Sequence, residues 1–276
     1  MNPAPAKALV GIFAWPPGVS DDAKANAIVA TLGVDRYEAA LMVKRGFPQI
    51  VGALPEAEAG AVTARLQRAQ IDATMAGPED LAAHARPDLA RRLHAGQDDD
   101  GPTYLAELWS GVTRIVRLAD FVLIVRARLK ETTVTETRRA GGMGRMSVPI
   151  GGMHMPAAPS EPRTTKTTKI SVSEIMDLHF EGDGPLRLHG DKFSFDVLEQ
   201  RGITDAENMD LLGVRLAEEA PQCSVDIDYG SFRLSQEVVR AFDQAVGRRG
   251  DPRVSVPAEF DLYSAWMAVR RRDQLG

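Results

Sequence analysis

Two histidines are the nearest approach in this chain to a catalytic or metal-binding pair. His179 and His189 flank the turn Glu181–Gly184, with Asp177 and Asp191 close by in the sequence. Imidazole beside carboxylate is the pairing that general bases and zinc sites use. Neighbouring strands of a hairpin bring many such pairs together, however, and no third ligand is spaced to complete a metal site. We therefore expect a structural role for both histidines.

Nucleophilic catalysis has little support in the sequence. Ser194 lies close to His189 and Asp191, but the chain contains no Gly-x-Ser-x-Gly motif. Cys223 is the single cysteine, which excludes an internal disulfide and a cysteine-built metal site. No histidine lies near it in the sequence, so we expect a small buried residue there rather than a reactive thiolate.

The remaining polar motifs also favour structural roles. The glycine-rich segments near residues 141 and 151 are not followed by Lys-Ser/Thr, so they do not match a phosphate-binding loop. Asp226 and Asp228 alternate along an extended segment, which is typical of a solvated face. The sequence therefore predicts no catalytic residues, no cofactor and no resident metal.

Residues 139–162 contain an unusual cluster of four methionines and one histidine, His154. Thioethers with an imidazole suit Cu(I), whereas methionines in a loop equally form an adaptable surface for a partner's groove. A plain flexible loop explains the composition as well as the partner does, and copper explains it least well. We predict partner contacts at Met143, Met146, Ile150, Met153 and Met155, with Tyr37 as an additional contact.

Length and composition indicate a globular protein of two domains. The chain has 276 residues, 44% of them hydrophobic and 26% charged. Its net charge of −5 gives no indication of nucleic-acid binding. No segment approaches the ~18 apolar residues of a spanning helix, and the N-terminus lacks a signal-peptide pattern. We expect a cytoplasmic, bacterial protein without membrane insertion.

The first domain is expected in residues 1–77, with the element order β-α-α-β-α-β. Ser20 and Asp35 are good N-caps, and Gly33 ends the first helix. The strands are expected at residues 8–13, 48–54 and 71–75, and the helices at 21–32, 35–44 and 56–70.

Residues Gly33–Thr74 resemble the C-terminal domain of the ribosomal stalk protein. The matching residues are Gly33, Glu38, Ala39, Val43, Glu58, Ala59, Ala61, Leu66 and Ala69, with Ile50, Leu54 and Val62 as apolar equivalents. The resemblance implies an adaptor-like fold for the domain of residues 1–77, about a quarter of the chain. Stalk domains bind translation factors through lysines, and Tyr37 and Ala40 stand at those positions. Factor binding is therefore not expected here.

Residues 78–102 are expected to connect the domains. The sequence predicts one or two short helices interrupted at Pro87, followed by an acidic linker at residues 97–101. The second domain is then expected from residue 103 to 276.

A long β-ribbon is the main feature predicted for the second domain. Residues 114–138 and 163–180 alternate in a strand pattern and are rich in threonine. Glutamates on the first arm face lysines on the second if the arms pair antiparallel. The loop of residues 139–162 would form the tip of this ribbon, without regular structure of its own.

The rest of the chain predicts a closing set of shorter elements. Strands are expected at residues 185–195 and 224–229, and helices at 205–220, 235–248 and 258–273. Several strands followed by an amphipathic helix resemble a bacterial pleckstrin-homology-like domain, although Leu118 and Ala119 replace the aromatic residue common in that family. Together the two domains predict an α+β fold.

The leading hypothesis is a non-catalytic protein–protein interaction module, a scaffold or adaptor whose partner the sequence does not identify. A structural subunit of a larger homo- or hetero-oligomeric assembly is the alternative. An enzyme centred on His179 and His189 is the second alternative.

Overall fold

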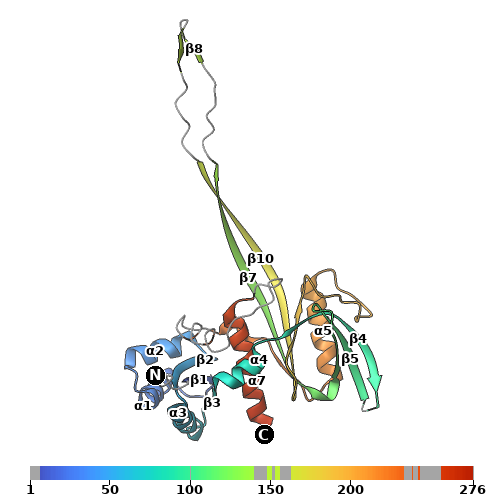
Figure 1. The fold of residues 1–276 in the computed structure, drawn as a ribbon. Helices are drawn as coiled ribbons and strands as arrows, with labels where there is room; N and C mark the ends of the chain where they lie inside the picture. The colour runs from blue at the N-terminus through green and yellow to red at the C-terminus, as the bar shows by residue number, and fades with distance from the viewer. Residues whose placement is uncertain are drawn as a thin grey trace, which may run out of the picture. The chain divides into compact units, whose positions relative to one another are not determined.

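The computed structural model describes residues 7–99, 101–139, 148–150, 153–155, 163–232, 238, 242 and 256–275. The chain forms two compact units, one of residues 1–128 and 174–276 and the other of residues 129–173. The described residues combine helices with one antiparallel sheet and one mixed sheet, so the predicted α+β class is confirmed (Figure 1).

The N-terminal residues fold in the predicted order. The elements are β1 (Lys7–Ala14), α1 (Asp21–Leu32), α2 (Arg36–Arg45), β2 (Gln49–Pro55), α3 (Glu56–Arg68) and β3 (Asp72–Ala76). The side chains of Ser20 and Asp35 accept hydrogen bonds from the first turns of α1 and α2, and Gly33 ends α1 at a φ of 70°. The predicted caps are therefore those observed. The resemblance to the stalk domain stays a prediction.

The three-stranded sheet, in the order β2-β1-β3, packs on both faces. Val10 and Ile12 of β1 lie in a core with Ile28 of α1 and Leu66 of α3. Leu9 belongs to another core, because successive residues of a strand point to opposite faces. The second face is therefore covered by a different part of the chain.

The connecting segment after this sheet differs from the prediction. Residues Pro78–His84 form helix α4, but Asp88–Asp98 form strand β4 rather than a second helix. β4 pairs with β5 (Gly101–Leu108), so the expected acidic linker forms the turn of a hairpin. A register shift between Ala90 and Arg92 places Ala90 and Leu93 on one face of β4, a spacing that matches a helix in the sequence. The prediction of a second helix and a linker was wrong for this reason.

A seven-stranded mixed sheet follows, in the order β12-β7-β10-β11-β4-β5-β6. The bounds not yet given are β6 (Thr113–Arg117), β7 (Phe121–Arg139), β10 (Arg163–Phe180), β11 (Leu186–His189) and β12 (Ser224–Asp226). β7 and β10 are neighbours, as the predicted ribbon requires. The predicted continuous strand 114–138 is interrupted by a 3-10 turn, η1 (Leu118–Asp120).

Two other predicted strands are shorter than expected. Of residues 185–195 only β11 is a strand, and of residues 224–229 only β12, which is followed by η2 (Asp228–Ser231). The predicted helix 235–248 lies outside the described residues, except for Val238 and Phe242, which are helical.

The second unit, residues 129–173, contains the continuations of β7 and β10 and a two-stranded sheet. β8 (Val148–Ile150) pairs antiparallel with β9 (Met153–Met155), so the tip segment does contain regular structure, contrary to the prediction. Residues 140–147, 151–152 and 156–162 lie outside the described residues.

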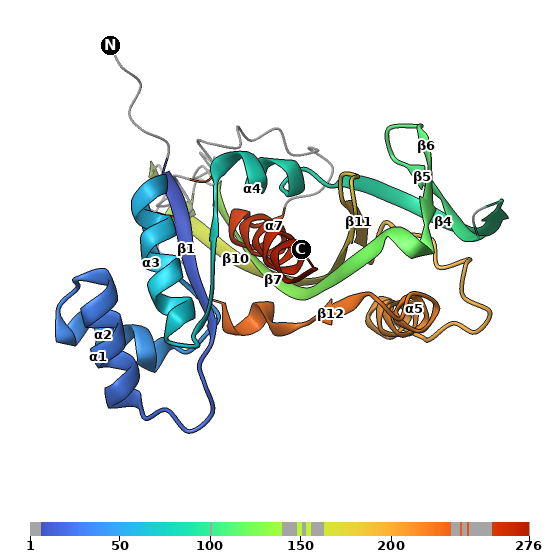
Figure 2. The ribbon, with the colours of Figure 1, turned by 90° about the horizontal axis from the view of Figure 1, so that it is seen from below.

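Two helices cover opposite faces of the large sheet. Met176 of β10 packs with Met209 and Leu212 of α5 (Asp205–Glu219). The next residue of β10, Asp177, bonds instead to Ser264 of α7 (Ala258–Leu275). Because neighbouring residues of a strand face opposite ways, α5 and α7 lie on opposite faces (Figure 2).

Helix α7 also closes the second face of the small sheet. Trp266 and Leu262 lie in one core with Leu9 of β1 and Leu81 of α4. A Cβ at Gly11 would stand 2.4 Å from the Trp266 ring, so only glycine lets the indole lie against β1. Figure 2 shows α7 between the two sheets. Among the described residues, no helix has the length and apolar character to cross a membrane.

Candidate interaction surface

Helix α5 is held at its start by a complete capping box. The Thr204 hydroxyl accepts from the Glu207 backbone N–H at 3.2 Å, and the Glu207 carboxylate accepts from the Thr204 and Ile203 backbone N–H groups. Asn208 adds a bond to the preceding chain, because its Oδ1 accepts from the Gly202 N–H at 2.8 Å. The first turn of α5 is therefore rigidly tied to the loop before it.

The solvent side of α5 carries an apolar stripe. Leu211 is 44% exposed and Val214 is 58% exposed, and the two lie three residues apart on one face of the helix. Glu207 and Glu218 continue the same stripe at helical spacing toward its two ends. The buried stripe is made of Met209, Leu212 and Leu216. The exposed apolar residues therefore do not belong to the core.

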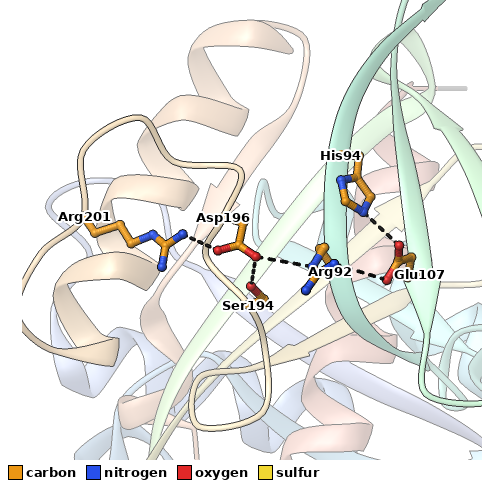
Figure 3. A network of polar contacts seen from close by, with 6 residues as sticks. All are labelled: Arg92, His94, Glu107, Ser194, Asp196 and Arg201. Carbon is orange, nitrogen blue, oxygen red and sulfur yellow. Dashed lines mark hydrogen bonds and ion pairs between the residues drawn. The ribbon is translucent and has the colours of Figure 1, made fainter.

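Residues 190–204, which connect β11 to α5, form a loop that packs beside this helix. Asp196 binds Arg201 within the loop and accepts from the Ser194 hydroxyl at 2.6 Å (Figure 3). Arg92 of β4 approaches Asp196 at 3.4 Å and Glu107 of β5 at 3.9 Å. The hydrogen bond with Ser194 and the Arg201 guanidinium hold the pKa of Asp196 below its ordinary value, so this carboxylate is ionised at neutral pH.

The same network continues on β5 and reaches a histidine. His94 Nε2 lies 2.9 Å from a Glu107 carboxylate oxygen (Figure 3). That hydrogen bond is the main cause of the lowered pKa of Glu107. Since all these groups are partly exposed, each pair contributes little to stability. Their joint effect is to give the 190–204 loop one position against the sheet.

Arg215 joins the 190–204 loop to helix α5. Its Nη1 donates to the Val197 carbonyl at 2.5 Å and its Nε to Glu219 at 2.7 Å. Tyr104 donates its hydroxyl to the other Glu219 oxygen at 2.6 Å, and burial together with this carboxylate raises the Tyr104 pKa. The charges of Arg215 and Glu219 are therefore paired with each other, and both side chains are held in place by further hydrogen bonds.

A groove of about 380 Å³ lies between the loop and the helix. It is lined by Leu198, Glu199, Gln200, Leu211, Arg215 and Glu219. Glu199 of the groove and Glu218 of the exposed stripe have no ion-pair partner among the residues that the structure describes. We call the groove together with the exposed stripe of Leu211 and Val214 the α5 surface. It combines an apolar centre with unpaired carboxylates around it.

A second polar cluster lies in the interior, where α7 meets the large sheet. Arg187 donates to both carboxylate oxygens of Asp177 at 2.7 Å and to Asp261 at 2.7 Å. Ser264 donates to Asp177 at 2.6 Å and lies 2.9 Å from His179 Nε2. Asp177, His179 and Ser264 are at most 1% exposed. This cluster bonds helix α7 to β10 and β11.

This cluster contains Ser, His and Asp, but the directions of its hydrogen bonds differ from those that activate a nucleophilic serine. A carboxylate only accepts hydrogen bonds, so the Ser264 hydroxyl donates its hydrogen bond to Asp177. His179 must then donate from its Nε2–H to the Ser264 oxygen. In a catalytic triad the histidine instead accepts the serine proton and donates to the aspartate. The arrangement therefore stabilises the interface between α7 and the sheet.

The two predicted histidines are not brought together. His189 lies opposite Ile175 in the β10–β11 ladder, and the Asp177–Arg187 pair separates it from His179. His189 contacts Asp191, whereas His179 stacks edge-to-face on His84 at 5.6 Å between ring centroids. The proposed His179/His189 centre therefore loses its geometric basis.

Acid should weaken the fold through His179. Burial lowers its pKa to about 3, against an unfolded value of about 6.5, and the charge of Asp177 only partly offsets the shift; His84 and Arg187 lower it further. The neutral ring stabilises the fold above pH 6.5, and this contribution is lost as pH falls from 6.5 to 3, to a total of roughly 4 kcal/mol. We expect urea unfolding at a series of pH values to show this loss.

The matched control for this pH dependence is His179→Gln, which keeps a donor near the position of Nε2 without a titrating group. Its stability should fall less steeply between pH 6.5 and 3. Some slope should remain, because burial also lowers the pKa of His84 and His189. Equal slopes for the two proteins would contradict the assignment to His179.

The other sequence candidates lie in separate places. The Ser194 hydroxyl bonds to Asp196 and not to His189, and burial raises the pKa of the Cys223 thiol to about 12. Asp226 is not on a solvated face as predicted, because it is partly buried and accepts from the Tyr263 hydroxyl at 2.5 Å.

The predicted partner-binding residues are divided between the two units. Tyr37 is 75% exposed on α2, and Ile150, Met153 and Met155 lie in β8 and β9. Met143 and Met146 lie outside the described residues. The α5 surface was missed, because the sequence shows Leu211, Leu212, Val214 and Leu216 together in one helix and does not directly show which of them are exposed. The i, i+3, i+7 spacing of Met209, Leu212 and Leu216 is the signal that would have separated the two sets.

No family model matches this chain, and no curated protein or solved structure matches it either.

Proposed function

We propose that this protein is a non-catalytic protein–protein interaction module, acting as a scaffold or adaptor in a bacterial cytoplasm. The observation that carries the proposal is the α5 surface. Its apolar residues are exposed at the centre, carboxylates surround them, and a bonded loop forms one side. In protein–protein interfaces, a few central residues surrounded by a polar rim contribute most of the binding free energy.

Preorganisation supports the same proposal. The 190–204 loop and α5 are joined by the capping box, by Asn208 and by Arg215 before any partner arrives. A surface that is already ordered loses little conformational entropy on binding. The segment 139–162, with its methionines, is proposed as a second contact of the same module.

Capture experiments with the full-length chain test this function. Leu211→Glu together with Val214→Glu should remove a specific protein partner from the set retained by the wild type, because two charges would enter the centre of the contact. After the partner is purified, calorimetry should give an affinity at least tenfold weaker for the double variant, as expected for truncating interface hot spots.

The matched control is Ile115→Glu on the edge strand β6, where Ile115 is 60% exposed. This variant places the same charge on another exposed apolar residue and should retain the partner. If wild type, control and double variant capture the same proteins with equal affinity, the α5 surface is not the interaction site.

A structural subunit of a larger assembly is the second candidate function. The unpaired carboxylates and exposed apolar residues of α5 are equally suited to a permanent neighbour. Light scattering on the purified chain over a range of concentrations separates the two. A permanent subunit should keep one oligomeric state at every concentration, whereas an interaction module should be monomeric when dilute.

A further inference from the structure

The α5 surface selects for a partner of particular chemistry. Glu199 in the groove and Glu218 on the exposed stripe are exposed and unpaired within the described part of the chain, whereas the arginine in the groove, Arg215, is already bonded to Glu219 and Val197. The net field at this surface is therefore negative. A complementary segment must carry several cations and flexible apolar side chains that fit beside Leu211.

One segment of this same chain has that chemistry. Residues 138–169 contain six cations and a single carboxylate, Glu161; the cations are Arg138, Arg139, Arg145, Arg163, Lys166 and Lys169. Four methionines lie between the cations, and unbranched thioether side chains adapt to irregular grooves. The chain as a whole is acidic, with a net charge of −5, so this run is a local reversal of its charge.

Parts of this segment have a described backbone. Residues 129–173 form a unit of their own, and β8 and β9 pair Ile150 with Met153 and Val148 with Met155. This pairing fixes the backbone of two short strands before binding, which lowers the entropy lost on binding.

The exposed apolar residues at the edge of the large sheet fit a basic segment less well. Ile115 and Val112 lie at the β6 edge beside Arg114 and Arg117, whose cations are paired with Asp88, Asp183 and Asp98. These three carboxylates already bind arginines of β6, so a basic segment would have to compete with those arginines for them. Charge complementarity therefore favours α5.

We propose that the α5 surface binds residues 138–169 of a second copy of this chain. The inference rests on the proposed interaction function and names its partner. The two contacting surfaces are different, so the contact is heterologous, and each copy in a pair keeps one unused surface of each kind. Such contacts continue into a closed ring or an open chain rather than stopping at a symmetric dimer.

The test uses the full-length chain and a synthetic peptide of residues 138–169 carrying a fluorophore. Fluorescence anisotropy should show the peptide binding to a variant whose residues 141–162 are replaced by Asn-Gly, in which the competing segment is shortened. Glu199→Lys with Glu218→Lys should weaken this binding at least tenfold, and raising the salt from 50 to 500 mM should weaken it further.

Sedimentation velocity on the wild type supplies the second measurement. Larger species should grow with protein concentration and disappear in the Glu199→Lys/Glu218→Lys variant. A charge exchange should restore them: the groove variant mixed with a chain carrying Arg145→Glu and Lys166→Glu should associate. The matched control is Glu79→Lys with Glu181→Lys, two exposed carboxylates outside α5.

The outcomes separate this inference from the proposed function. If the peptide binds but the wild type stays monomeric at every concentration, the segment binds within its own chain. That result would overturn the assignment to a second copy. Absence of peptide binding, while Leu211→Glu/Val214→Glu still loses a different captured protein, would overturn the inference and leave the interaction function intact. Absence of both effects would overturn both.

Discussion

Replacing Trp266 with alanine is expected to lower the free energy of unfolding by about 3–5 kcal/mol. Trp266 is 1% exposed and lies against β1 in the core that joins α7, α4 and the small sheet. Its removal leaves a cavity that the neighbouring side chains cannot fill without shifting the helix. Urea unfolding followed by circular dichroism should show an earlier midpoint and, because this core joins the small sheet to α7 and α4, a broader transition.

The control for Trp266→Ala lies on the same helix. Leu275 is 59% exposed, and Leu275→Ala should change stability by less than about 0.5 kcal/mol. Gly11→Ala adds a complementary measurement, since the new Cβ would collide with the Trp266 ring and cost about 1–3 kcal/mol. In the Trp266→Ala background the same substitution should cost much less. Additive losses in the double variant would show that the two residues do not press on each other.

Replacing Asp177 with alanine is expected to cost about 3–5 kcal/mol as well, for an electrostatic reason. Arg187, 6% exposed, would keep only Asp261, and the Ser264 hydroxyl would lose its acceptor. With one carboxylate in place of two, much less of the cost of taking the Arg187 cation out of water is offset. Chemical denaturation at pH 7 should measure the loss directly.

Two comparisons test the electrostatic origin of that loss. Asp196→Ala removes a carboxylate that binds Arg201 at the exposed surface, and it should cost under about 1 kcal/mol. Asp177→Leu combined with Arg187→Met should recover much of the loss, because apolar residues of similar size remove both charges together. If the double replacement is worse than Asp177→Ala, packing around Arg187, including its contact with the Phe260 ring, matters more than charge.

The N-terminal elements could be predicted because their signals are local. Ser20, Asp35 and Gly33 act within one turn of the helix they begin or end, and the order of all six elements is confirmed. Strand β4 could not be predicted in this way. The register shift after Ala90 gives its apolar residues a helical spacing, and its neighbours β5 and β11 decide its conformation.

The candidate surface was harder to predict than the fold. The cap of α5 follows from Thr204 and Glu207, and helical spacing marks its buried stripe. No local pattern, however, indicates that residues 190–204 form the other side of the groove. The buried cluster illustrates the same limit. Asp177 and Arg187 are ten residues apart, whereas Ser264 comes from an element far along the chain, so no local pattern relates them.

Helix α7 has a consequence for synthesis of the protein. The second face of the small sheet, with Leu9 near the start of the chain, is closed by residues up to Val269. A growing chain on the ribosome therefore holds that apolar face open until the residues of α7 have been made. Contacts so distant in sequence also slow folding. We expect the N-terminal elements to depend on chaperone protection during translation, and a prematurely terminated product to be degraded rather than to persist as a folded fragment.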